Sequence, residues 1–356
     1  MTAKKETKKL NFKGQDFYIG IDVHKNNWKV TIRHNYMELK TFSMNPNPEE
    51  LEKYMRKNYP NGIYHSVYEA GFCGFWIHRR LNSLGFDNRI VNAADVPTNN
   101  KEKDRKRDAI DSRKLARGLE SRSLQGIYIP AEQQQALRSV ARLYQQKVHQ
   151  RKMTKQRIKS FLHFNGIPIP RRDEICHWSG RFIHYLKKLQ FTQEEDNYCL
   201  QSLLSDLLQY RQECLAIIRY MRQISKDIKI IGSLRSVPGI GFITAFMLYA
   251  ELMDIRRFNN TDALACYVGI IPSVHSSDNK EKVKGITTRH NKYLRKLLIE
   301  ASWIAVRNDP ALTEAFTNYC KRMVKQKAII RIARKLINRI RYVWLNEKFY
   351  QIGVVA

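Results

Sequence analysis

Hydrophobic and polar positions in the first third of the chain alternate between two periods. Short apolar, β-branched runs have the period of strands, and the segments between them have the three-to-four spacing of amphipathic helices. The predicted strands cover residues 17–23, 28–33, 38–42, 63–69 and 89–92. The predicted helices follow Pro48 and cover residues 75–84 and 108–121. The first three strands lie close enough in sequence for an antiparallel meander.

This order of elements indicates a mixed α/β domain. Three strands followed by alternating helices and strands are expected of a ribonuclease-H-like domain, which here spans residues 17–128 after a basic tail at 1–16. We predict that a helical region at 129–232 and a mostly helical C-terminal domain at 233–356 complete the chain.

The helical region contains two long periodic segments. Apolar residues spaced by four, three and four positions predict an amphipathic helix that starts near Gln133 and ends at Gly166, Pro168 and Pro170. They are Leu137, Ala141, Tyr144 and Val148.

From Leu200 onward, alternating spacings of three and four predict a coiled-coil seam. Its positions are Leu200, Leu203, Leu207, Tyr210, Cys214, Ile217, Met221, Ile224, Ile228 and Ile231. The partner is either the helix at 133–164 or a second protomer, and an ordinary buried helix in a bundle is the alternative.

The C-terminal domain opens with the sequence SVPGIG between two helical patterns. Pro238 to Gly241 therefore predict the turn of a helix-hairpin-helix, in which Gly239 and Gly241 let backbone N–H groups meet a phosphate. A tight turn between helices without any ligand explains the same residues equally well.

Charge narrows the choice of partner. The 356 residues include 63 Lys and Arg against 33 Asp and Glu, a formal net charge of +30, so a polyanion is the expected partner. No apolar run is long enough to span a bilayer, and the polar, basic N-terminus does not resemble a signal peptide. The 6 cysteines show no C-x-x-C spacing, so reduced cytosolic thiols are expected.

The basic residues gather in two places. Residues 133–172 hold ten Lys and Arg without a single acid, and residues 280–341 hold seventeen against four acids. A charge run is usually a solvated surface, but this length without an acid favours nucleic-acid binding. The candidate nucleic-acid contacts are Lys147, Arg151, Lys152, Lys155, Arg157, Lys159, Gly239, Gly241, Arg289, Asn291 and Arg295.

Four carboxylates in the first domain are candidate metal ligands. Asp22 and Glu69 end two predicted strands, and Asp108 and Asp111 lie three apart on one face of a predicted helix. Converging carboxylates bind hard cations such as Mg²⁺ or Mn²⁺, and paired ions assist phosphodiester chemistry. Ordinary solvated carboxylates are the alternative.

A polar segment in the C-terminal domain carries hydroxyl groups. Ser273, Ser276 and Ser277 lie in a predicted loop ahead of Arg289, Asn291 and Arg295. A serine nucleophile needs a base, a metal or cationic neighbours to activate it, and the local sequence identifies none.

Five motifs, in order, resemble those of the IS-one-ten family, the DEDD-type transposases related to pilin-gene invertases and bridge-RNA-guided recombinases. GIDVHK resembles the first acidic motif, YEAGFCGF the second and DAIDSRKLAR the third, while SVPGIG and YVGIIPSVHSSD resemble the C-terminal domain. Two features depart from the family pattern: Asp278 follows Ser277 where glycine is common, and Thr288–Asn291 lacks a glycine.

The resemblance implies a RuvC-like domain whose metal ligands are Asp22, Glu69, Asp108 and Asp111. It also implies a serine nucleophile at Ser277, with Ser276 as the adjacent alternative. Donor and target DNA, a structured noncoding guide RNA and a homodimer or homotetramer are the implied partners, and the bacterial cytoplasm, at the nucleoid, is the implied location. We therefore expect a DNA recombinase that forms a covalent phosphoserine intermediate. The alternatives are a metal-only nuclease or junction resolvase, and a noncatalytic nucleic-acid-binding protein.

Overall fold

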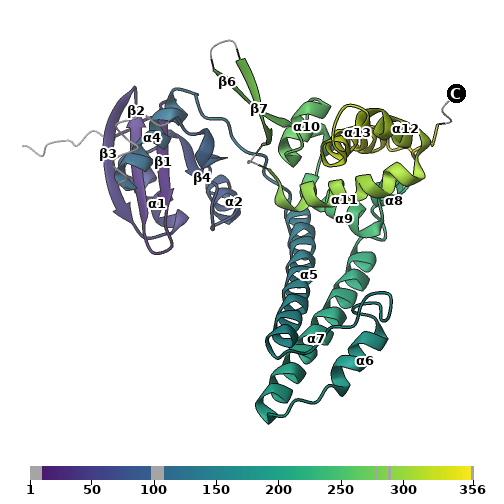
Figure 1. Cartoon of the computed structure of the whole chain (residues 1–356). Helices are drawn as coiled ribbons and strands as arrows, with labels where there is room; N and C mark the ends of the chain where they lie inside the picture. Colours follow the sequence, from purple (N-terminus) through teal and green to yellow (C-terminus); the bar gives the residue numbers. More distant parts are fainter. Residues whose placement is uncertain (1–9, 98–107, 278–279, 288–289, 354–356) are drawn as a thin grey trace, which may run out of the picture. The chain divides into compact units, whose positions relative to one another are not determined.

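The computed structural model describes residues 10–97, 108–277, 280–287 and 290–353. The chain divides into two compact units, Met1–Ile129 and Pro130–Ala356 (Figure 1). Each unit has a hydrophobic core of its own. In the described residues no helix combines the length and the apolar character needed to cross a bilayer.

The N-terminal unit is built on a five-stranded mixed sheet, which confirms the predicted fold class. Its strand order is β3-β2-β1-β4-β5; β1 pairs antiparallel with β2 and parallel with β4. The strands are β1 (Asp16–Val23), β2 (Trp28–His34), β3 (Met37–Met44), β4 (Ile63–Glu69) and β5 (Asp87–Val91). All five predicted strands are present, with ends that differ by a few residues.

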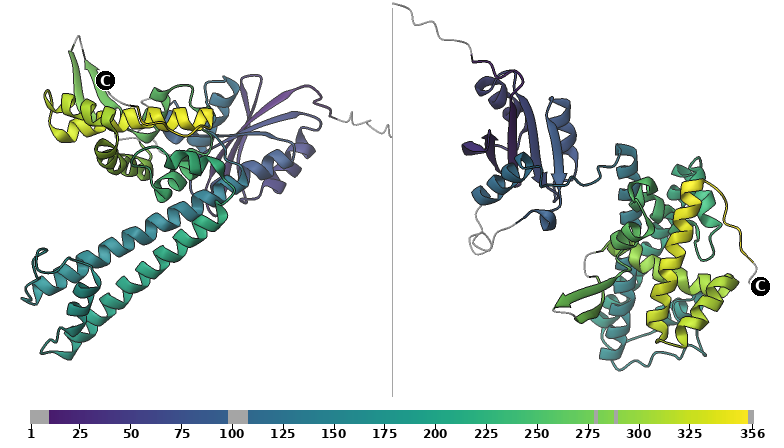
Figure 2. Two further views of the ribbon diagram at one scale, coloured as in Figure 1. Left: turned by 90° about the vertical axis from the view of Figure 1, so that its right-hand side faces the viewer. Right: turned by 90° about the horizontal axis from the view of Figure 1, so that it is seen from above.

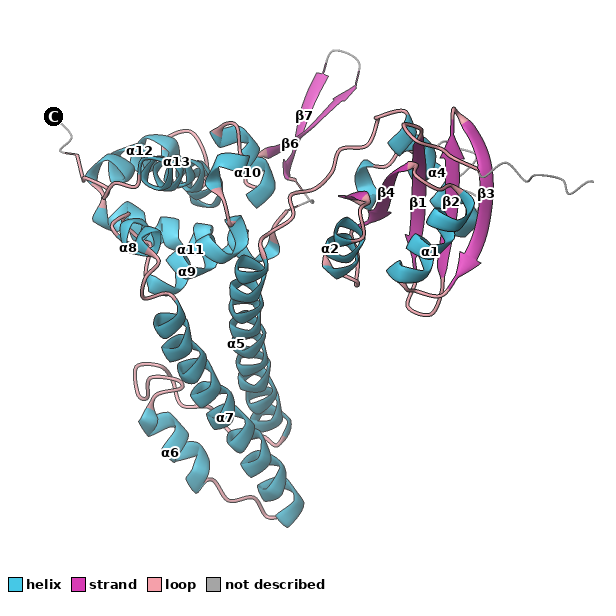
Figure 3. Cartoon of the chain, turned by 180° about the vertical axis from the view of Figure 1, so that it is seen from behind, coloured by secondary structure: helices cyan, strands magenta, loops and turns pink. Residues whose placement is uncertain are grey.

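Helices cover both faces of the sheet (Figures 1 and 3). On one face, α1 (Pro48–Asn58) and α2 (Trp76–Ser83) pack on the alternate apolar residues of β1, such as Ile19 and Ile21. On the other face lies α4 (Asp108–Glu120), and a short 3₁₀ helix, η1 (Ala93–Asp95), follows β5. Alternation along β1 therefore gives each face its own layer of helices.

The second unit begins with two long helices that lie side by side (Figure 2): α5 (Glu132–Phe164) and α7 (Glu194–Ile224). Thus α7 has an intrachain partner. The predicted continuation of its apolar repeat to Ile231 is wrong, because the helix ends at Ile224. Ser225 caps that end, and Ile231 belongs to the next helix, α8 (Lys229–Arg235). Serine and aspartate between them favour local backbone hydrogen bonds over helix continuation.

A small helix that we did not predict packs at the far end of this pair. Ser179 caps α6 (Gly180–Lys188) through a hydrogen bond from the Phe182 amide, 3.2 Å long. Phe182 and Leu186 join the apolar residues at the end of α5 and the start of α7 in a separate small core.

The remaining helices form the largest core of the molecule. They are α9 (Phe242–Leu252), η2 (Ile255–Arg257), α10 (Thr261–Val268), α11 (Lys292–Asn308), α12 (Pro310–Cys320) and α13 (Lys325–Asn346). Leu137 of α5 and Met221 of α7 belong to the same core, so apolar packing continues across residue 232. The predicted boundary there remains a prediction.

Candidate functional site

Asp22 and Glu69 stand at the carboxyl ends of neighbouring parallel strands. Ile21 and Tyr68 are the last paired residues of β1 and β4, so the two carboxylates follow them at the same level. Gly20 pairs with Val67 two residues earlier. Because side chains alternate along a strand, both carboxylates share the face of Gly20 rather than that of Ile21.

The helix on that face rests directly on β1. A Cβ atom on Gly20 would lie 2.1 Å from the Ser112 carbonyl oxygen, so only glycine permits this approach. The Ser112 hydroxyl also lies 2.9 Å from the hydroxyl of Thr31 on β2, and both residues are fully buried. These contacts place the middle of α4 over Gly20.

The far end of α4 fixes the direction of the helix. Glu120 accepts hydrogen bonds from Arg33 Nε and from the Tyr36 amide, each 2.6 Å long. Arg33 pairs with Tyr18, near the start of β1. Therefore α4 runs antiparallel to β1, and its first turn lies toward the carboxyl end of β1, where Asp22 is.

Asp111 precedes Ser112, and Asp108 begins the helix one turn earlier. Four helical residues span about 6 Å and two strand residues about 6.6 Å, so the start of α4 reaches the level of Asp22. The side chain of Asp108 lies outside the described residues. The backbone thus brings β1, β4 and the start of α4 to one corner of the sheet.

The described carboxylates at this corner are partly exposed. The side chain of Asp22 is 21% exposed, with His24 Nε2 3.1 Å from its Oδ2. That of Asp111 is 32% exposed and accepts a 3.2 Å hydrogen bond from Lys114, which is 8% exposed. Carboxylate oxygens of this kind fit a hard divalent cation by their chemistry. Among the described side chains, which leave out Asp108, no group of three metal-binding residues is assembled.

The serine segment is a strand, which corrects the predicted loop. Ser277 ends β6 (Pro272–Ser277) and pairs with Lys280, the first residue of β7 (Lys280–Ile286). The pairs Pro272–Ile286 and Val274–Val283 are apolar, and the other three pairs are polar, so the alternation that signals a strand is weak in the sequence. Ser276 is also in β6, and Asp278 lies outside the described residues. Ser277 therefore stands where the two-stranded ribbon meets its connecting residues.

The predicted basic residues of α5 differ in their surroundings. Lys152 and Arg157 are exposed, whereas the others are partly buried. Lys147 contacts Glu213 of α7 at 2.7 Å, and this hydrogen bond raises the pKa of Lys147. Lys159 Nζ lies 3.5 Å from His177 Nδ1. Thus some basic side chains of α5 contact neighbouring segments, and others are exposed to solvent.

The turn between α8 and α9 confirms the two predicted helices around Pro238–Gly241. Gly239 has a φ of +83°, and a Cβ on it would lie 2.3 Å from the carbonyl oxygen of Ala301 in α11. Gly241 is the N-cap of α9, and no atom lies within 4 Å of where its Cβ would be. Gly239 is thus required for close packing between helices, while Gly241, at the N-terminus of α9, is exposed.

Three predicted nucleic-acid contacts, Arg289, Asn291 and Arg295, lie just before α11 or in its first turn. Arg289 lies outside the described residues. Asn291 is the N-cap of α11, and its oxygen accepts hydrogen bonds from the amides of Tyr293 and Leu294, at 3.0 and 3.1 Å. Arg295 donates to the Thr287 carbonyl oxygen, and burial lowers its pKa. Asn291 and Arg295 therefore shape the segment that follows the ribbon.

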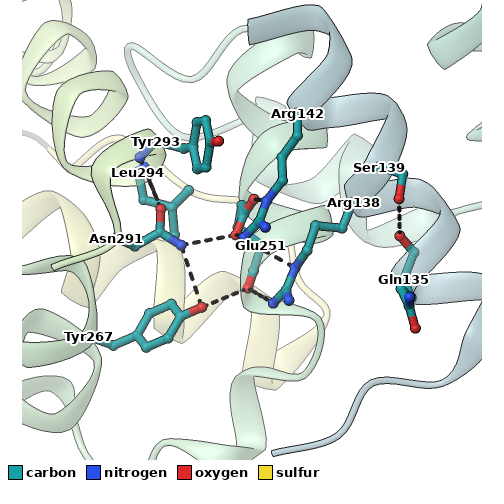
Figure 4. Close-up of polar contacts among 9 residues, drawn as sticks. All are labelled: Gln135, Arg138, Ser139, Arg142, Glu251, Tyr267, Asn291, Tyr293 and Leu294. Atoms are coloured by element: carbon teal, nitrogen blue, oxygen red, sulfur yellow. Dashed lines mark hydrogen bonds and ion pairs between the residues drawn. The ribbon is translucent and has the colours of Figure 1, made fainter. Parts of the chain in front are cut away.

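A buried carboxylate that the sequence analysis missed joins these elements (Figure 4). Glu251 of α9 is fully buried and accepts two hydrogen bonds from Arg142 of α5, at 2.8 and 3.1 Å. Arg138 Nε lies 3.6 Å away, and the amide of Asn291 donates to Glu251 at 3.0 Å. Tyr267 donates to the Glu251 carbonyl oxygen at 3.3 Å. The carboxylate of Glu251 thus connects α9 with α5 and the N-cap of α11, and the carbonyl oxygen of the same residue connects α9 with α10.

The pairing explains why a buried charge is tolerated there. The hydrogen bond from Arg142 to Glu251 raises the pKa of the guanidinium, so Arg142 stays charged. Buried charges occur almost only when paired. A single acid near the end of the otherwise apolar run FITAFMLYAEL was the signal in the sequence. Glu251 therefore has a structural role, since both of its carboxylate oxygens accept hydrogen bonds from the protein.

Comparison with known families matches both units. A family model described as "Transposase IS116/IS110/IS902 family" matches residues 232–317, and a DEDD model for IS110 elements, described as "Transposase", matches residues 19–165. The second range includes all four candidate carboxylates, and the first includes Ser277.

Individual relatives cover most of the chain. A putative transposase of Sinorhizobium fredii is 28% identical over 81% of this chain and 77% of its own length. The transposase of insertion sequence element IS1533 from Leptospira borgpetersenii is 27% identical over 80% and 84%. That of IS1111A from Coxiella burnetii is 23% identical over 77% and 74%.

Proposed function

This chain belongs to the IS110/IS116/IS902 family of transposases, and from that premise we propose that it cuts and rejoins DNA through a covalent bond to Ser277. In this proposal Asp22, Glu69, Asp108 and Asp111 hold divalent cations, Mg²⁺ or Mn²⁺, at the scissile phosphate. A DEDD-type transposase domain implies the use of divalent cations.

The observation that carries the proposal is the convergence of β1, β4 and α4. Neighbouring parallel strands carry Asp22 and Glu69 at their carboxyl ends, and the first turn of α4 lies over the same corner. Bound there, divalent cations would supply positive charge to the phosphate oxygens. The carboxylates of the chain would hold these charges in a fixed place, on strands and a helix rather than on loops.

The proposed covalent step exchanges one phosphodiester for another. The Ser277 oxygen forms a bond to phosphorus, and the bond between phosphorus and one DNA oxygen breaks. The serine hydroxyl loses its proton to a carboxylate or to solvent, and the released DNA oxygen takes up a proton. Rejoining is the reverse reaction with the hydroxyl of another strand, so no nucleotide cofactor is needed.

We assign nucleic-acid binding to the exposed basic face of α5 and the N-terminus of α9 at Gly241. The net charge of +30 supports this assignment, because a chain with such an excess binds a polyanion. A noncoding guide RNA and a homodimer or homotetramer complete the proposal. Nuclease-protected RNA that copurifies with the protein, together with the mass of the complex by light scattering, tests both partners.

A suicide DNA substrate tests the covalent step. We expect a protein–DNA adduct that mass spectrometry maps to Ser277, and no adduct with Ser277→Ala. Ser276→Ala is the matched control and should still form it. A metal-only nuclease, in which water attacks, would leave Ser277→Ala able to cut, and this result would reject the serine mechanism.

Mixed assemblies test whether the carboxylates and the serine of different subunits cooperate. Asp22→Asn and Ser277→Ala should each be inactive alone. When the two variants are mixed, cleavage returns if one protomer supplies the serine and another the carboxylates. No recovery in verified mixed assemblies would restrict the site to groups of a single chain.

A further inference from the structure

A small cavity lies between the end of α5, α7 and the segment before α6. Its volume is about 150 Å³, and it is lined by Arg151, Lys155, Arg211 and Trp178 above an apolar floor that includes Ile183 and Leu207. Arg151 and Lys155 are one turn apart on α5, and Arg211 comes from α7. Three positively charged side chains from two helices therefore line one partly open cavity.

These charges lack an acidic partner in the described part of the chain. None of the three forms an ion pair with a described carboxylate, whereas Lys147, two turns before Lys155, contacts Glu213 at 2.7 Å. Burial lowers the pKa of Lys155, and the nearby charges of Arg151 and Arg211 lower it further. Such an arrangement is unfavourable by itself and becomes favourable when an anion enters.

The aromatic wall of the cavity is held in an unusual backbone conformation. Trp178 has a φ of +68°, a left-handed conformation that bulky residues rarely adopt. Lys155 Nζ lies 5.0 Å from the centre of its ring, and Phe182 packs edge-on against it at 5.3 Å. Strain of this kind persists where surrounding contacts fix it, and it gathers at binding sites. Here the strained residue places its ring against the Lys155 ammonium group in the lining of the cavity.

We propose that this cavity binds a backbone phosphate of a nucleic-acid strand, with Arg151, Lys155 and Arg211 as its charged contacts. Arginine forks and a lysine ammonium group are the donors that proteins use for phosphate. The inference rests on the proposed function, because it needs nucleic acid along α5. It adds Arg211 and Trp178, which the sequence analysis did not select.

Binding of single-stranded RNA and DNA oligonucleotides of one sequence tests the proposal with the full-length protein. The variants are Lys155→Met and Arg211→Gln. Their matched controls are Lys188→Met and Arg181→Gln on the exposed side of α6, which change the net charge equally. We expect about tenfold weaker binding for each cavity variant, because a hydrogen bond to a charged group is lost. The controls should stay within about twofold, the general effect of one surface charge.

The source of the phosphate follows from the two oligonucleotides. If the cavity variants bind only RNA more weakly, the cavity is an RNA site; if they bind only DNA more weakly, it is a DNA site. Weaker binding of both oligonucleotides means that the cavity accepts a backbone phosphate of either. An equal loss of oligonucleotide affinity in the cavity variants and the control variants would overturn the proposal. So would a changed oligomeric state with unchanged oligonucleotide affinity, since that result points to a protein carboxylate as the occupant.

Two further measurements separate this proposal from folding and from the proposed function. The pKa of Lys155 is lower in the folded chain than in the unfolded one. At pH values between these two pKa values the unfolded chain therefore binds more protons, so stability rises with pH there. The charge of Lys155 therefore costs stability at neutral pH, and Lys155→Met should melt at the same or a higher temperature. NMR of ¹³C-methylated lysines should show the pKa of Lys155 rising when inorganic phosphate is added. If wild-type protein binds oligonucleotides and these effects are absent, the cavity proposal fails while the proposed function stands.

Discussion

Two acidic sites in this molecule differ in what surrounds the carboxylates. Asp22 and Asp111 in the N-terminal unit keep 21% and 32% of their side chains exposed. Glu251 in the second unit is fully buried and accepts hydrogen bonds from Arg142 and Asn291. The first site retains access for a ligand, whereas the oxygens of the second are bound to protein donors.

Under the proposed function, the same chemical group serves reaction in one place and architecture in another. At strand ends, carboxylates stand on a rigid frame yet remain open, which suits exchange of cations and substrate. Inside a helical core, a carboxylate is tolerated only when its charge and hydrogen bonds are satisfied. Exposure and pairing, more than residue type, separate the two roles.

The largest expected effect is on catalysis at the open site. Asp22→Asn should lower strand cleavage at least about a hundredfold, because a charge that acts on the transition state is lost. Oligonucleotide affinity and melting temperature should stay close to wild type. The control is Asp16→Asn, at the other end of β1, where the carboxylate contacts His65 at 2.9 Å. Equal loss of cleavage in both variants would mean that neither carboxylate has a specific role.

The next effect is on stability at the closed site. Glu251→Gln should lower the free energy of unfolding by about 3 kcal/mol, because Arg142 and Arg138 keep their charges without a carboxylate. Denaturant titration measures this change. Glu213→Gln removes the more exposed partner of Lys147 and should change stability little. If the two variants are equally stable, the buried ion pair contributes no more to the free energy of unfolding than the exposed one, and the account of Glu251 is wrong.

A smaller effect should follow from pushing α4 away from the sheet. Gly20→Ala places a Cβ 2.1 Å from the Ser112 carbonyl oxygen, so the helix must shift. We expect a loss of about 2 kcal/mol in unfolding free energy, together with reduced cleavage. Gly126→Ala is the control, because its Cβ would meet its nearest atom at an ordinary 3.8 Å. If Gly20→Ala is destabilised but cleaves DNA as fast as wild type, the position of α4 does not matter for the reaction.

Much of the N-terminal unit could be predicted from local pattern. Residues such as Ile19 and Ile21 alternate with the period of a strand, and the spacing of Asp108 and Asp111 identifies one helix face. The confirmed strands then place Asp22 and Glu69 at one edge of the sheet. Prediction succeeded here because short-range periodicity and sheet geometry together decide the arrangement.

The features that escaped prediction depend on contacts between distant residues. The β6 strand around Ser277 has almost no apolar alternation, and its pairing with β7 defines it. The repeat of α7 continues in sequence past Ile224, but the chain turns at Ser225. The bond between Arg142 and Glu251 joins residues 109 positions apart. Periodicity carries no information about such pairs.

Direct measurement of cation binding tests the central claim that the strand-end carboxylates hold divalent metal. Mn²⁺ titration followed by electron paramagnetic resonance should show binding to the wild-type protein and to Asp16→Asn. Binding should be strongly weakened in Asp22→Asn and in Glu69→Gln. A folded wild-type protein, with or without DNA, that binds no Mn²⁺, or an Asp22→Asn variant that binds it as well as wild type, would contradict the account.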